Sequence, residues 1–364
     1  MSSRAPIEKS YLILVLILAF AGFFIFSSAT LGLLAQSGLI AKSVLVNQTI
    51  GLCLGLMAFY IFSRINYKLF RRYAFFIFVA AILLNLALFI PHLSLHYNGA
   101  SRWIDIGPIT FQPSEFLKIA FIIYFAAWLA HKKGKIKDFK SGLLPFLVLM
   151  AVTGALLLSQ RDTDTFAIIF ATGLGQLIIA GGKLRHIGLG ILAIIAVVAL
   201  VAYFRPYARE RIMTYLDPAS DPQGAGYQLQ QSLIAIGSGG MFGRGYGQSI
   251  QKFGYLPEPV GDSIYAVTAE EFGFVGATTL VILFILFTIK CFRIAARSPD
   301  DFGGFLVSGI AILVVVESFM NMASEIGLIP FSGIPLLFVS HGGTALILAL
   351  SASGIVANVS RHAK

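Results

Sequence analysis

Residues 11–36 read YLILVLILAFAGFFIFSSATLGLLAQ, a run that no charged residue interrupts. A helix needs roughly 20 mostly apolar residues to cross about 30 Å of hydrocarbon, and this stretch is long enough. Nine further stretches of the same character follow it, at 44–63, 73–91, 113–131, 142–159, 165–181, 187–204, 264–289, 303–325 and 336–358. With a mean hydropathy of +0.84, the sequence predicts an all-α, polytopic integral membrane protein of about ten transmembrane helices.

The basic residues alternate along the chain between the connections that join these stretches. Four Lys or Arg residues lie in 64–72 and five in 132–140, whereas most of the intervening short loops carry one or none. The positive-inside rule therefore places both termini in the cytoplasm and the long 205–263 connection between helices 7 and 8 outside. The net charge of +10 is then a topology signal and predicts no nucleic-acid partner.

The sequence offers few signs of soluble-enzyme or metal chemistry. Cys53 and Cys291 give no metal-ligand spacing, so no metal ligands are assigned. No P-loop or HExxH motif occurs, and no stretch outside the membrane is long enough to build a cofactor-binding core.

The long external connection contains three unusual segments. Residues 205–211 carry three arginines on the external side, and Arg suits phosphate because its planar fork binds two oxygens. Residues 227–236 have the spacing of a short amphipathic helix able to lie in the membrane interface. Six glycines then fall within 237–247, a run expected to let the backbone approach a ligand closely.

Asp262 begins the carboxylate-rich stretch 261–271, where the chain re-enters the membrane. An ionised side chain there is costly, which makes it a candidate functional residue. The alternative is a helix N-cap, because Asp followed by Ser-Ile at the head of a span is a good cap. Glu270 and Glu271 lie about two turns deeper and could support the site or serve packing.

Three other clusters differ from ordinary membrane sequence. Glu115 and Lys118 lie three residues apart just inside the fourth stretch, where they could line a polar cavity or form an ion pair between helices. Asp162 lies in a polar turn that could be merely solvated. The Ser340–Thr344 segment could simply provide small residues for helix packing.

Six motifs stand in order along the chain: GASRWIDIG at 99–107, FQPSEFLK at 111–118, GAGYQL at 224–229, QSLIAIGSGG at 231–240, YLPEPVGDSI at 255–264 and AEEFGF at 269–274. Together these motifs resemble the SEDS family (shape, elongation, division and sporulation), which includes RodA, FtsW and SpoVE. The resemblance covers nearly the whole chain, implies a bacterial cytoplasmic membrane and leans toward the FtsW-like division branch. The chain departs from the usual family pattern at Arg161, Thr163, Asp164, His341 and Thr344.

The resemblance implies a single SEDS-type transmembrane domain over residues 1–364 and a peptidoglycan glycosyltransferase that polymerises lipid II. Asp262 would be the catalytic base. Positive charge at the leaving undecaprenyl diphosphate would come from Arg102, Lys118 and Arg211 or from a divalent cation (Mg or Mn). The implied substrate-binding residues are Arg102, Trp103, Glu115, Lys118, Asp162, Arg211 and Ser340.

The implied partners are a class B penicillin-binding protein (a transpeptidase), other membrane proteins of the divisome or elongasome, and membrane lipids. Two alternatives remain open at this stage. A flippase for lipid-linked precursors would also carry intramembrane charges and glycine breaks, although the polar groups concentrate on the external half. A non-catalytic scaffold of the cell-wall complex should tolerate the loss of Asp262.

Overall fold

The computed structural model describes residues 7–35, 37–90, 94–97, 100–106, 109–204 and 206–363. Within these ranges, eight helices are long and apolar enough to cross a membrane. They are α1 (Lys9–Thr30), α2 (Gly38–Arg64), α3 (Lys68–Leu86), α4 (Pro113–His131), α5 (Leu144–Ser159, extended by a π-helical turn at Phe139–Leu143), α10 (Ile264–Ala296), α11 (Asp301–Glu325) and α12 (Gly343–Ser360).

The two remaining predicted spans form α6 (Thr163–Ile179) and α7 (Leu184–Phe204), whose apolar parts are shorter. The tenth predicted span begins seven residues too early, because the chain is irregular up to Gly342 and α12 starts only at Gly343.

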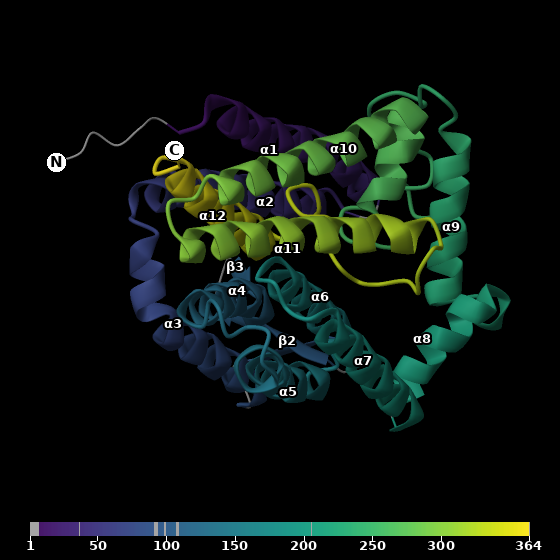
Figure 1. Ribbon diagram of the computed structural model, residues 1–364. Helices are drawn as coiled ribbons and strands as arrows, with labels where there is room; N and C mark the ends of the chain where they lie inside the picture. Colours follow the sequence, from purple (N-terminus) through teal and green to yellow (C-terminus); the bar gives the residue numbers. More distant parts are fainter. Residues whose placement is uncertain are drawn as a thin grey trace.

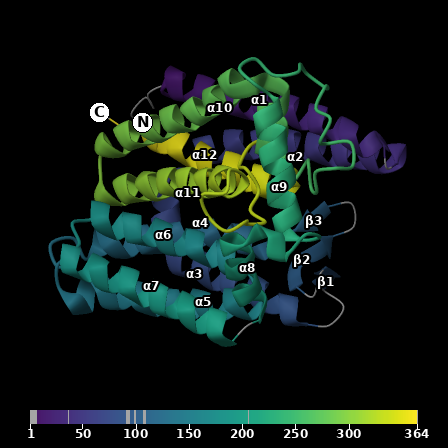
Figure 2. The same cartoon turned by 90° about the vertical axis from the view of Figure 1, so that its right-hand side faces the viewer.

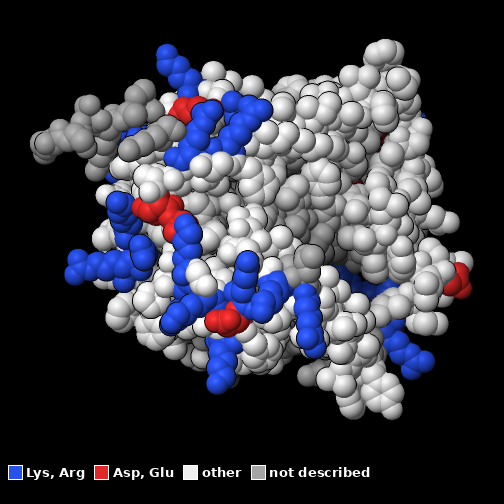
Figure 3. Space-filling model, in the orientation of Figure 1, with Lys and Arg blue, Asp and Glu red and all other residues white. Residues whose placement is uncertain are grey.

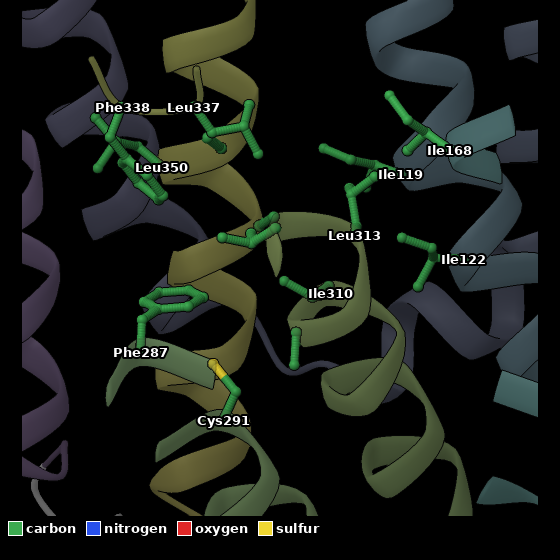
Figure 4. Packing of buried hydrophobic residues seen from close by; sticks show 14 of the residues in the cluster. Ile119, Ile122, Ile168, Phe287, Cys291, Ile310, Leu313, Leu337, Phe338 and Leu350 are labelled. Carbon is green, nitrogen blue, oxygen red and sulfur yellow. The ribbon is translucent and has the colours of Figure 1, made fainter. Parts of the chain in front are cut away.

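The long helices lie side by side around a buried apolar core (Figures 1 and 2). Figure 4 shows Ile310 and Leu313 of α11 facing Ile119 and Ile122 of α4. Where α12 crosses α2, small residues let the backbones meet: a Cβ on Gly354 would lie 2.6 Å from the carbonyl oxygen of Phe59. Such close approach is how helices associate in lipid, where no hydrophobic difference drives them together.

The connection before α4 contains a small sheet that the all-α prediction did not include. Strands β1 (Ser94–Tyr97), β2 (Ala100–Ile106) and β3 (Ile109–Phe111) pair antiparallel in that order. The register places Ile104 opposite Phe111. The central strand carries Arg102 and Trp103, so the sheet gives these two residues a defined position next to the start of α4.

The 205–263 connection is mostly ordered helix. It contains α8 (Pro206–Leu216), a 3-10 turn at Pro218–Ser220 and α9 (Ala225–Ser238). The predicted amphipathic helix at 227–236 is confirmed and extends two residues further at each end. In both views α9 runs across the direction of α10 and α11, at the end of the bundle opposite the chain termini (Figure 1).

The glycine run approaches a helix and not the cavity described below, so the expectation of a ligand there is corrected. Helix α10 is broken at Gly273, which has φ 65° and ψ −167°. The N–H of Phe274 donates to the carbonyl oxygen of Gly240 at 2.8 Å. A Cβ on Gly243 would lie 2.1 Å from the carbonyl oxygen of Glu271. The glycines therefore permit two backbones to pair where α10 is interrupted.

The two ends of the chain lie together. The N–H of Glu8 lies 3.5 Å from Ser360 Oγ, and Lys290 Nζ lies 3.1 Å from Glu8 Oε1. Figure 3 shows Lys and Arg side chains gathered over this half of the visible face, whereas the half formed by α9 and the neighbouring part of α10 is largely uncharged. Charge on this face is thus unevenly distributed along the length of the bundle.

Candidate functional site

A cavity of about 640 Å³ lies among α2, α4, α6, α11 and the segments that precede α10 and α12. Its volume is within the range typical of ligand sites. Seven of the eight predicted site residues line it, and Ser340 does not. The charged residues in its wall are Arg102, Glu115, Lys118, Arg161, Asp162, Asp164, Arg211, Glu258, Asp262 and Glu317, with His341 beside them.

Asp262 is half-buried at the cavity wall, just before α10. Asp262 Oδ1 accepts a hydrogen bond from Gln228 Nε2 of α9 at 3.1 Å, and its main-chain oxygen accepts one from Asn321 Nδ2 of α11 at 2.8 Å. Burial and, to a smaller extent, the Glu258 carboxylate raise the pKa of the Asp262 carboxyl to about 7, against the opposing effects of a main-chain hydrogen bond, Gln228 and Arg211. A carboxyl with a pKa near 7 is suited to accept a proton at neutral pH.

The N-cap interpretation of Asp262 is wrong. The N-cap residue of α10 is Ser263, and its side chain makes no capping hydrogen bond. The carboxylate of Glu325, at the end of α11, takes that role: its oxygens accept from the N–H groups of Tyr265 at 3.3 Å and Ala266 at 2.6 Å. Because another acid binds the first turn of α10, the Asp262 side chain is not needed there.

Lys118 lies between two buried carboxylates. Its Nζ is 2.9 Å from Glu115 Oε1, one turn away on α4, and 2.6 Å from both carboxylate oxygens of Glu317 on α11. The side chains are at most 5% exposed. Both interpretations of the Glu115–Lys118 pair therefore apply: it lines the cavity, and it belongs to an ion pair that joins two helices.

Arg211 on α8 is held by an acid that the sequence did not single out as a partner. Its two terminal nitrogens lie 2.9 and 3.0 Å from the two oxygens of Asp164, and Nη2 also donates to the carbonyl oxygen of Phe331 at 2.9 Å. This fork joins α8 to the start of α6 and to the segment before α12. Asp164 departs from the usual family turn, and here it orients a cavity arginine.

Arg102 and Asp162 both lie at the turn between α5 and α6. An Arg102 terminal nitrogen donates to the carbonyl oxygen of Arg161, a residue with φ 58°. Asp162 caps α6, since its Oδ1 accepts from the N–H of Thr165 at 3.3 Å. Asp162 is 2% exposed, and its Oδ2 has no hydrogen-bond partner within the described part of the chain. One oxygen of this carboxylate therefore caps the helix, and the other is buried without a hydrogen bond at a residue that lines the cavity.

Ser340 lies behind the cavity wall. Its Oγ donates to the carbonyl oxygen of Gly261 at 2.6 Å and accepts from the N–H of Leu336 at 2.8 Å. The N–H of His341 donates to the carbonyl oxygen of Val260 at 2.6 Å. These bonds fasten the segment before α12 to the residues that immediately precede Asp262.

Helix α11 supplies three site residues that the sequence analysis missed, namely Glu317, Asn321 and Glu325. All three are fully buried. Glu317 binds Lys118, and Asn321 binds the main-chain oxygen of Asp262. Glu325 binds the first turn of α10. Their spacing of i, i+4 and i+8 puts them on one face of a spanning helix, and two acids in such a helix were the signal that could have revealed them.

Glu270 and Glu271 serve packing. Glu271 Oε1 lies 2.5 Å from Lys252 Nζ, and Glu270 Oε2 accepts from Ser249 Oγ at 2.6 Å. Both carboxylates thereby hold the segment before α10 against the helix. Among the residues that the structure describes, no group of three or more His, Cys, Asp or Glu could hold a metal ion. A divalent cation in the cavity would need oxygen ligands from a substrate to complete its coordination. Mg²⁺ commonly takes such ligands from substrate phosphates.

Comparison with known proteins identifies the family. The family model described as "Cell cycle protein", which carries the names FtsW, RodA and SpoVE, matches residues 8–364. The chain belongs to this family. The resemblance inferred from the motifs is therefore confirmed, and so is a multi-pass membrane protein of the FtsW/RodA/SpoVE type.

Two curated relatives of this family illustrate the similarity. The chain is 38% identical over 317 residues to a probable peptidoglycan glycosyltransferase FtsW of Geobacter sp. (strain M18), covering 87% of this chain and 86% of that protein. It is 37% identical over 312 residues to the stage V sporulation protein E of Bacillus subtilis, covering 85% of each.

Solved structures agree with this assignment. A chain from a peptidoglycan synthase complex that coordinates polymerization and crosslinking superposes with a TM-score of 0.82 at 25% identity, covering 98% of both chains. The rod-shape-determining protein RodA of Thermus thermophilus superposes with a TM-score of 0.71 at 23% identity, covering 98% of this chain and 97% of RodA, and supports the fold.

Proposed function

We propose that this chain is a peptidoglycan glycosyltransferase that polymerises lipid II at the outer face of the cytoplasmic membrane, with Asp262 as the general base. One observation carries this proposal: a half-buried carboxyl with a pKa of about 7 lies in the wall of a large, charged cavity. The cavity volume accommodates a polar headgroup, and the family relatives named peptidoglycan glycosyltransferases support the same reaction.

The reaction needs little from the protein beyond a base and a suitably charged site. Asp262 accepts the proton of the acceptor's GlcNAc 4-hydroxyl while that oxygen forms a bond to the anomeric carbon of the donor MurNAc. The bond from this carbon to the diphosphate oxygen breaks, and undecaprenyl diphosphate leaves with the bonding electrons. A single displacement inverts the anomeric carbon, which gives a β-linked glycan from an α-linked donor.

The basic residues of the cavity act on the diphosphate in this proposal. Arg102 offers a planar guanidinium that suits phosphate oxygens. The fork of Arg211 is already bound to Asp164, so Arg211 acts on the diphosphate through its positive charge at the cavity wall. Lys118 shares its charge with two carboxylates, so we propose that it mainly organises α4 and α11. If a divalent cation accompanies the diphosphate, the second oxygen of Asp162 is a suitable protein ligand.

The orientation of the chain in the membrane is inferred from the uneven distribution of its Lys and Arg residues. We propose that the end with both termini and most Lys and Arg residues lies in the cytoplasm, and that α8, α9 and the Asp262 segment lie outside. In a variant whose two native cysteines are replaced by Ala, single cysteines at the exposed positions Lys135 and Arg293 should resist an impermeant thiol reagent in whole cells, whereas a cysteine at exposed Gln223 should react.

Permeabilised cells provide the control for this experiment, because all three cysteines should react there. Labelling of Lys135→Cys and Arg293→Cys in intact cells would contradict the orientation and, with it, an active site at the outer face.

The relative in a peptidoglycan synthase complex suggests a partner for this chain. We propose a class B penicillin-binding protein that docks through its single membrane helix and cross-links the glycan that this chain makes. Co-purification with such a partner should raise the rate of lipid II polymerisation above that of the chain alone. Equal rates with and without the partner, together with no co-purification, would count against this interaction.

The direct test of the proposed function is polymerisation of lipid II by the purified full-length chain, alone and with a candidate transpeptidase. Glycan products are separated by gel electrophoresis after digestion of any peptide cross-links. The same preparation in vesicles, assayed for transfer of a fluorescent lipid precursor between leaflets, tests the flippase alternative. Glycan synthesis would support the proposal. Lipid transfer without glycan synthesis would support a flippase, and the absence of both activities would support a scaffold.

A further inference from the structure

Helix α9 contacts the Asp262 carboxylate directly. Gln228, near the start of this helix, donates from Nε2 to Asp262 Oδ1 at 3.1 Å and to Ser263 Oγ at 2.9 Å. An ionised carboxylate only accepts hydrogen bonds, so the nitrogen side of the amide must face it. The base is thus held from two sides, by Gln228 at its side chain and by Asn321 at its main-chain oxygen.

Helix α9 is itself anchored beside this segment. Ser232 and Ala235 are fully buried on the face of α9 that packs toward the bundle, whereas Leu233 and Ile234 on other faces are 45% and 49% exposed. At its end, the N–H of Gly243 donates to the carbonyl oxygen of Gly239, next to the interruption in α10. The position of Gln228 therefore follows the position of α9 as a whole.

We propose that Gln228 is a positioning residue through which α9 favours the ionised form of Asp262 and directs it into the cavity. This inference rests on the proposed function of Asp262 as a base. It assigns to α9, which lies across the external end of the bundle, control over whether that base is ready to accept a proton.

The electrostatic surroundings make a neutral donor at this position important. Glu258 on the same segment acts on Asp262 as a like charge and favours its protonated form, whereas Arg211 of α8 favours the ionised form. Glu325 of α11 lies close by, with its oxygens bound to the first turn of α10. His341, on the segment before α12, lines the same cavity, and burial lowers its pKa, so it adds little positive charge at neutral pH. Gln228 supplies the hydrogen bond from α9 that stabilises the ionised carboxylate.

Gln228→Leu tests this role because it keeps approximate size and removes both donors. Losing one hydrogen bond to a charged group should shift the pH midpoint of the polymerisation rate upward by about one unit. The rate at pH 7 should then fall about fivefold, and it should return to the parent rate above about pH 9, where Asp262 is ionised in both proteins. A merely structural role for Gln228 would lower the rate equally at every pH.

A second measurement separates this inference from the proposed function. The carboxyl band of Asp262, assigned in infrared difference spectra by its absence from Asp262→Asn, should titrate about one pH unit higher in Gln228→Leu than in the parent protein. This titration needs no catalysis. If the chain does not polymerise lipid II but the band still shifts, the proposed function fails while the role of Gln228 stands.

Two further variants complete the test. Gln230→Leu changes an exposed glutamine on the same helix and should leave both the rate profile and the band unchanged. Gln228→Asn keeps the amide on a shorter side chain and should shift the midpoint less than Gln228→Leu, which provides a readout if the Leu variant does not fold. An unshifted infrared midpoint in folded Gln228→Leu, or a rate deficit that high pH does not relieve, would overturn the inference.

Discussion

Asp262→Asn is expected to lower the rate of lipid II polymerisation by about 10²–10⁴-fold, the usual cost of losing a general base. The substitution keeps the size of the side chain and its hydrogen-bonding oxygen, but an amide cannot take up a proton at neutral pH. Since Glu325, and not Asp262, binds the first turn of α10, the variant should fold normally and reach the membrane. The measurement is the initial rate of glycan synthesis by equal amounts of purified protein.

The pH dependence of the parent enzyme gives an independent check. Because the folded pKa of Asp262 is about 7, the rate should rise with pH through about 7 and level off above it. The same raised pKa means that Asp262 contributes stability while it is protonated, and this contribution is lost as pH rises through about 7. Asp262→Asn should remove that part of the pH dependence of unfolding. If Asp262→Asn polymerises lipid II at nearly the parent rate, the catalytic assignment is refuted and the flippase or scaffold alternatives are favoured.

Lys118→Gln is expected to destabilise the protein by about 3–5 kcal/mol, because it leaves two buried carboxylates without their cation. Glu115 and Glu317 are 5% and 0% exposed and have Lys118 as their shared ionic partner. Adding Glu317→Gln to Lys118→Gln should recover part of the loss, since one unpaired charge is then removed. The measurement is thermal unfolding in detergent, together with the fraction of protein that elutes as a folded species from size-exclusion chromatography.

Lys133→Gln is the matched control for this prediction. Lys133 also forms a lysine–carboxylate pair, 2.6 Å from Asp301, but the two side chains are 63% and 42% exposed. Its loss should cost at most about 1 kcal/mol. If Lys118→Gln unfolds at the same temperature as Lys133→Gln, the buried ion pair does not stabilise the bundle, and an anion-binding role for Lys118 regains weight.

The spanning helices could be predicted from the sequence because each one carries its own signal. Hydropathy over about 20 residues is a local property, and a membrane leaves the backbone little choice except helix. The amphipathic helix α9 was likewise predictable from the spacing of Leu229, Leu233 and Ile236. Asp262 and five of the nine other charged residues in the cavity wall stood out because charge is rare and costly in such a chain.

The partners of these residues could not be read from the chain, because each pair joins segments far apart in sequence. Lys118 meets Glu317, 199 residues later, and Asp262 is held by Asn321, 59 residues later. Local patterns left two residues with open interpretations: a cap or a base for Asp262, and a cavity residue or an ion pair for Lys118. The structure excludes the cap and gives Lys118 both roles. The sequence by itself determined which segments are apolar enough to span a membrane and which charged residues are candidates for chemistry. Only the tertiary structure decided what each charge faces, because burial and neighbouring charges set a carboxyl's affinity for its proton.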